Sequence, residues 1–174
     1  MLEVIKNRRS CRQFKSTKID EKTIKEIIDA GLNAPSGMNR QTPIVIAIQD
    51  TEIRNKLAEL NRSFASSRWP EGFDPFYGAP LILLVIAHKD GLSVHDGSAC
   101  IENMLLEATN QGLGSCWIHR AKEEIESKEG RELLKSTGLN FDDYIGVGHV
   151  IVGYKEDHAE IRPKEIKEGR YYII

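Results

Sequence analysis

Residues 81–87 read Leu-Ile-Leu-Leu-Val-Ile-Ala, an unbroken apolar run inside a chain of 174 residues. The run is far shorter than the roughly 20 residues that a membrane-spanning helix needs. Its length and β-branched content are typical of a strand, and because every position is apolar, both faces of that strand must be buried. We therefore expect a sheet that carries helices on both of its faces.

The sequence on either side of this run predicts helices that alternate with strands. Apolar periodicity indicates a short N-terminal helix, then helices that start after Asp20, at Asp50 or Thr51, and after Asp96. The remaining predicted elements are strands at 44–48, 115–118 and 144–154 and a mostly helical stretch at 121–137. Residues 61–78 show no clear period, and loops of this length often act as functional lids.

Composition narrows the class of protein. Hydrophobic residues make up 40% and charged residues 29% of the chain, which excludes a disordered chain. The 24 basic and 26 acidic residues give a net charge of −2, which argues against nucleic acid as the main partner. The start lacks the apolar stretch of a signal peptide. We expect a single domain over residues 1–174, cytoplasmic and with no membrane partner.

The three cysteines and five histidines lack the spacings that are typical of metal sites and disulfide frameworks. Cys11, Cys100 and Cys116 are far apart and form no C-x-x-C pair, so we expect buried thiols and no disulfide framework. The histidines form no i+3 or i+4 pair, so no metal site is predicted.

Known catalytic motifs are missing from the sequence. There is no phosphate loop, no dinucleotide fingerprint and no nucleophile elbow. The many carboxylates fall on predicted helices and are interpreted as solvated faces. If the protein is an enzyme, the demanding chemistry belongs to a cofactor, and no catalytic side chain is predicted.

A basic segment near the start is the first candidate binding site. Arg8, Arg9 and Arg12 surround Ser10, and 162–164 reads Arg-Pro-Lys. Guanidinium groups bind phosphate in bidentate fashion, and a serine hydroxyl adds a donor. The alternative interpretation is that these side chains only form solvated faces.

Six segments taken in chain order resemble the nitroreductase family of flavin mononucleotide (FMN) oxidoreductases, in its short form. The segments are Arg8-Arg9-Ser10-Cys11-Arg12-Gln13-Phe14, 34–43 (APSGMNRQTP), 78–82 (GAPLI), 112–118 (GLGSCWI), 152–154 (VGY) and 162–164 (RPK). The first two are similar to the family's R-x-S-x-[RK]-x-F and A-P-S-x-x-N-x-Q-P motifs. The ordered set spreads over nearly the whole chain.

The resemblance implies an α+β fold, a three-layer αβα sandwich with a mixed, mainly antiparallel sheet, in an obligate homodimer with FMN at the interface. It implies that Arg8, Arg9, Ser10, Arg162 and Lys164 hold the phosphate and that Arg12 lies by the flavin N1 and O2 edge. It also implies that Pro35, Ser36, Gly37, Met38, Asn39 and Gln41 come from the partner subunit, and that Trp117, Ile118 and His119 offer backbone contacts to the ring.

The implied activity passes electrons from NADH or NADPH through flavin N5 to a small acceptor such as a nitroaromatic or a quinone. Two alternatives stay open: an FMN-binding module without turnover, for storage or sensing, and a different flavin redox step such as dehalogenation or flavin fragmentation. The apolar end at 171–174 follows a polar tail. It is expected either to fold back on its own core or to pack against the partner subunit.

Overall fold

The apolar run forms the strand β2 (Leu81–His88) in the interior of a four-stranded sheet. In the computed structural model, which describes residues 1–65, 69–159 and 164–174, β2 pairs with β1 (Pro43–Ile48) and with β4 (Tyr144–Gly153). The strand β3 (Gly114–Ile118) pairs with the other side of β4. The strand order is therefore β1-β2-β4-β3.

The pairing directions correct the prediction of a mixed sheet. All three strand pairs are antiparallel, with Ile44 opposite Ile86, for example. In the described part of the chain, the parallel component is a single bridge between Ser10 and Ser115. The N-terminal segment bridges Ser115 and then, at Phe14, the residue that follows β4 by two positions, Lys155. It crosses the end of the sheet and does not follow β3 long enough to form a parallel strand.

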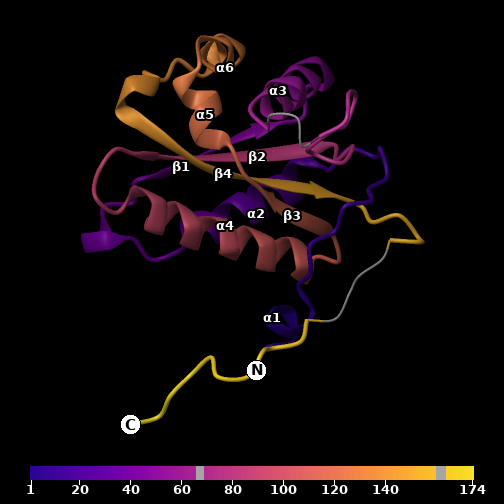
Figure 1. Cartoon of the computed structure of the whole chain (residues 1–174), viewed down its shortest axis with the longest axis vertical. Coiled ribbons are helices and arrows are strands. Elements are labelled where there is room, and N and C mark those ends of the chain that lie inside the picture. The colour runs from indigo at the N-terminus through magenta and orange to yellow at the C-terminus, as the bar shows by residue number, and fades with distance from the viewer. Residues whose placement is uncertain (66–68, 160–163) are drawn as a thin grey trace.

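Helices cover both faces of the sheet, which confirms the predicted three layers (Figure 1). One layer contains α3 (Thr51–Ser63), α5 (Ala121–Glu126) and α6 (Lys128–Leu133). The opposite layer contains α2 (Glu21–Leu32) and α4 (Ser93–Asn110). The short elements are α1 (Glu3–Asn7), η1 (Gly37–Asn39), η3 (Lys135–Thr137) and η4 (Phe141–Asp143).

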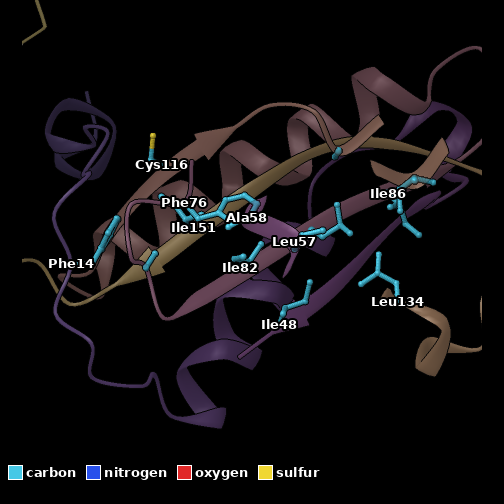
Figure 2. Close-up of a cluster of buried hydrophobic side chains, with 14 of the residues drawn as sticks. Phe14, Ile48, Leu57, Ala58, Phe76, Ile82, Ile86, Cys116, Leu134 and Ile151 are labelled. Atoms are coloured by element: carbon cyan, nitrogen blue, oxygen red, sulfur yellow. The ribbon is translucent and has the colours of Figure 1, made fainter. Parts of the chain in front are cut away.

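Alternate side chains along β2 point to opposite faces of the sheet and belong to two separate hydrophobic cores. Ile82, Leu84 and Ile86 join the cluster under α3 and α5, part of which Figure 2 shows. The intervening residues at 81, 83 and 85 join the cluster under α2 and α4. Residues 81–87 are all fully buried, and burying a side chain of leucine or isoleucine size contributes about 1.5–3 kcal/mol. This burial is consistent with a run in which every residue is apolar.

Two predicted helix starts are confirmed and a third is wrong. Asp20 accepts the Thr23 N–H at 2.9 Å, and Asp50 accepts the Ile53 N–H at 2.9 Å, so both cap their helices. The helix expected after Asp96 already begins at Ser93, which places Asp96 inside its first turn.

The C-terminal tail lies apart from the sandwich. The tail runs away from the body as an extended trace (Figure 1), and the side chains at 171–174 are exposed. In the described part of the chain, this excludes the interpretation that the apolar end folds back on its own core. No helix among the described residues has the length and apolar character needed to cross a membrane.

Candidate functional site

A cavity of about 290 Å³ lies beside the C-terminal half of β3. Four segments that are distant in the sequence form it: the N-terminal segment, the end of α3, the stretch before β2, and the turn after β3. Its lining consists of Arg12, Asn61, Trp69, Phe73, Pro75, Tyr77 and residues 116–120.

Aromatic rings from the stretch before β2 form one wall of the cavity. Trp69 stacks on Phe73 with ring centroids 4.3 Å apart, and Phe73 meets Tyr77 edge-on at 5.6 Å. The stretch at 61–78, expected to be irregular and lid-like, therefore contributes a packed wall. Its first residues differ from that prediction, because α3 continues to Ser63 and includes Asn61.

An internal ion pair holds the turn that carries Tyr77. The Asp74 carboxylate accepts the backbone N–H groups of Phe76 at 2.8 Å and Gly78 at 2.7 Å, and it pairs with Arg54. Arg54 also donates through Nε to the Ala79 carbonyl at 3.2 Å. These bonds fix a backbone in which Tyr77 has a φ of 52°, a region that non-glycine residues rarely adopt.

Arg12 is a cation at the cavity without an ionic partner in the described chain. Its guanidinium carbon lies 5.7 Å from the centroid of the Tyr77 ring, which is cation–π distance. The backbone around it is fixed, because Cys11 N–H donates to Ser115 O and Lys15 N–H donates to Tyr154 O, both at 2.8 Å. Hydrogen bonds to the edge of the sheet thus fix the backbone at Arg12, while the charge of its side chain remains available to a ligand.

The rest of the basic segment continues along the same edge. Arg8 Nε lies 3.6 Å from Glu102 Oε1, and Arg9 Nη1 donates to the Arg8 carbonyl at 2.6 Å. Ser10 is half-buried next to β3, at its bridge with Ser115. These three phosphate candidates are consecutive in the chain, and Arg12 is the member of the basic segment that lies among the described cavity-lining residues. Lys164 is exposed in the tail, and Arg162 lies outside the described residues.

The loop at 35–41 lies elsewhere, against the first turn of α4. The Gly37 N–H donates to Asp96 Oδ1 at 3.0 Å, and a Cβ at Gly37 would lie 2.2 Å from Leu92 Cδ1, so a larger residue here would require the Leu92 side chain to move. Left-handed backbone follows at Met38, Asn39 and Gln41. None of the candidates at 35–39 and 41 lines the cavity of its own chain.

The end of β3 and the turn after it form another part of the cavity lining. Trp117, Ile118 and His119, for which the resemblance implies backbone contacts to the ring, all line the cavity. Trp117 packs over Gly148, where a Cβ would lie 2.3 Å from the indole Nε1. Arg120 then adopts a left-handed φ of 82° and donates to the Phe64 carbonyl.

Behind this turn lie three polar residues that the sequence does not predict as a group. Glu124 and His149 are fully buried and hydrogen-bonded to each other, and the buried Asn61 contacts Glu124. The interpretation of all carboxylates as solvated is wrong for Glu124 and for Asp96. A signal for Glu124 exists, because it follows Ala121 by three residues and precedes Ile125, and both lie on the buried face of α5.

The cysteines confirm the predicted burial. Cys11, Cys100 and Cys116 are free and buried, and Cys116 backs the cavity. Burial raises the pKa of the Cys100 thiol to about 11, so this thiol stays protonated at neutral pH. Within the described ranges, no cluster of three or more His, Cys, Asp or Glu residues could hold a metal ion.

Comparison with known proteins gives one consistent result. Residues 5–154 match the Nitroreductase family. A crystal structure of a nitroreductase with bound FMN from Bacteroides fragilis superimposes with a TM-score of 0.90 at 32% identity, covering 99% of this chain and 97% of that one. A relative from Archaeoglobus fulgidus is 30% identical over 166 residues, which is 91% of this chain and 87% of that protein.

A second archaeal relative is longer than this chain. The protein from Methanothermobacter thermautotrophicus is 29% identical over 133 residues, 72% of this chain. The match spans 65% of that protein's length, slightly less than two thirds. The names of both archaeal relatives refer to NADH dehydrogenase and NAD(P)H nitroreductase.

Proposed function

Because the chain belongs to the nitroreductase family, we propose that it is an FMN-dependent oxidoreductase that transfers electrons from NADH or NADPH to a small organic acceptor. The observation that carries this proposal is the setting of Arg12. It is a cation with no ionic partner in the described chain, at a cavity walled by aromatic rings and by the amide of Asn61. Such a site suits a flat, polar ring system that gains negative charge.

The residues present fit both parts of FMN. The aromatic wall and the backbone at 117–119 would contact the ring system, with Arg12 beside its N1 and O2 edge. Arg8, Arg9 and Ser10 continue along the sheet edge and would hold the terminal phosphate, joined by Lys164. When bound, FMN would supply two-electron chemistry at N5, and the chain would supply binding, orientation and a stabilising charge. No side chain is assigned as an acid, because solvent can supply protons.

We propose further that the complete site needs two copies of the chain. The loop at 35–41 presents exposed groups such as Met38, but it lies at the Ser93 end of α4, away from the cavity of its own chain. In a homodimer, this loop would complete the partner's cavity. Exposed apolar side chains at Leu92 and Val94 beside the loop and at 171–174 support an assembly that buries them.

The experiment is a cofactor titration followed by turnover. Apoprotein is titrated with FMN, with FAD as the control, and binding is followed by quenching of flavin fluorescence. The complex is then mixed anaerobically with NADH or NADPH and assayed with nitroaromatic and quinone acceptors. We expect FMN uptake at micromolar concentration, bleaching by the reductant, and acceptor-dependent NAD(P)H oxidation. Failure to bind FMN refutes the proposal, whereas FMN binding without turnover supports the binding-module alternative.

A further inference from the structure

Two ionisable side chains are buried together behind the cavity wall. Glu124 of α5 and His149 of β4 have no exposed side-chain surface, and Glu124 Oε2 lies 2.7 Å from His149 Nε2. Burying two charged groups costs free energy that their mutual attraction offsets only in part, and well-packed apolar residues often stabilise a core as well or better. The pair therefore calls for an explanation other than stability.

The hydrogen bonds of His149 connect the pair to the turn after β3. One ring nitrogen meets the Glu124 carboxylate, and Nδ1 lies 3.4 Å from the Ile118 carbonyl oxygen. The Ile118 carbonyl can only accept, so Nδ1 is the ring nitrogen that must carry a hydrogen to bond it. The imidazole ring therefore links the Glu124 side chain to the backbone of Ile118, a residue that lines the cavity.

Glu124 also fixes the orientation of the Asn61 amide. Asn61 Nδ2 donates to Glu124 Oε1 at 2.6 Å and to the His119 carbonyl at 2.9 Å, which uses both of its hydrogens. A flipped amide would place Oδ1 against these two acceptors. The amide oxygen, which has no partner in the described chain, is therefore left for the cavity that Asn61 lines.

We infer that Glu124 and His149 are a positioning pair: they hold the Asn61 amide and the turn at 118–119 so that the cavity presents a hydrogen-bond acceptor to an N–H group of the bound ring system. The identity of that ring system rests on the proposed function. The positioning itself is a property of the protein alone.

The test compares two ways of changing the pair. The double variant Glu124→Leu/His149→Phe replaces both partners with apolar groups of similar size and leaves no buried charge unpaired. Glu124→Gln is the matched control, because glutamine can donate to a neutral His149 and still accept from Asn61. We expect Glu124→Gln to unfold near the parental temperature and the double variant to unfold somewhat lower, because the Ile118 carbonyl and one Asn61 N–H lose their partners, but to remain folded at the temperature of the binding assay. FMN affinity should fall roughly three- to tenfold in the double variant and stay within about twofold in Glu124→Gln, as expected for one neutral hydrogen bond.

Asn61→Leu, which leaves the pair intact, provides an independent check. It should lower FMN affinity by no more than the double variant does, and adding it to the double variant should cost less than it costs in the parental protein, because the pair acts in part through this amide. Unchanged FMN affinity in the double variant would overturn the inference. So would additive losses in the triple variant.

Hydrogen exchange separates this inference from the proposed function. In apoprotein without any flavin, peptides covering 117–121 should exchange faster in the double variant and at the parental rate in Glu124→Gln. Equal protection in all three proteins overturns the positioning role. A chain that fails to take up FMN refutes the proposed function, and this exchange result still decides the role of the pair.

Discussion

Asp74→Asn should destabilise the fold through the turn that carries Tyr77. The substitution removes the charge partner of Arg54 and turns an amide N–H₂ toward backbone donors that the carboxylate now accepts. Breaking a buried ion pair costs about 3–5 kcal/mol. The Arg54 side chain is only 11% exposed, but Asp74 keeps 30%, so the low end of the range applies, about 3 kcal/mol. For a chain of this size, the melting temperature should fall by roughly 6–12 °C.

The assay is thermal unfolding followed by circular dichroism, repeated with urea to obtain the midpoint. Asp157→Asn is the matched control, because Asp157 also pairs with a cation, Lys15 at 2.7 Å, but is 92% exposed. Solvent screens such a pair, so no resolvable shift is expected from the control. Equal melting temperatures for the two variants would refute the reasoning that the Arg54–Asp74 pair anchors this turn.

Three further predictions concern charge and assembly. Arg12→Ala should lower the reduction potential of bound FMN by about 20–45 mV, which corresponds to about 1–2 kcal/mol of lost attraction to the reduced form. Arg9→Ala should instead weaken FMN binding about ten- to hundredfold and leave the potential unchanged. Dye-coupled potentiometry and titration of the apoprotein separate the two, and equal effects would contradict the division of roles. A chain truncated before Tyr171 should self-associate more weakly in light scattering, and an equally stable dimer would contradict a role for the tail in assembly. The Thr23 N–H and hydroxyl hold the pKa of the Asp20 carboxyl below its usual value, so the stabilisation from this carboxylate is present above about pH 4 and is lost as the pH falls through the lowered pKa. The difference in melting temperature between the parent and Asp20→Asn should therefore shrink in acid. A constant difference would argue against this cap.

Local patterns in the sequence predict most of the elements. The apolar run at 81–87 specifies a strand buried on both faces, and Asp20 and Asp50 cap helices through bonds three residues away. Such features depend on near neighbours, which a periodicity argument captures. The start of α4 is mispredicted because Asp96 resembles a cap but instead accepts hydrogen bonds from Gly37 and Thr42, more than 50 residues away.

The site is less predictable because its contacts are long-range. The basic residues of the N-terminal segment are visible in the sequence, yet their alignment along β3 depends on the bridge from Ser10 to Ser115. The Glu124–His149 pair joins a charged helix to an apolar strand, and the sequence of neither segment indicates that the two side chains meet. The separation of the candidate residues between the cavity and the loop at the start of α4 also becomes visible only when the fold is known.

The position of β4 in the sheet has a consequence for biosynthesis. This strand lies between β2 and β3, both of which precede it in the chain, so β1 and β2 can pair early but β3 cannot join them until residue 153 is available. During synthesis on the ribosome, the apolar strand β2 would therefore wait with one open edge, a state that invites pairing with other nascent chains. We expect the sheet to be completed only after β4 has been synthesised, and chaperones that shield β2 before that point to raise the yield of native protein.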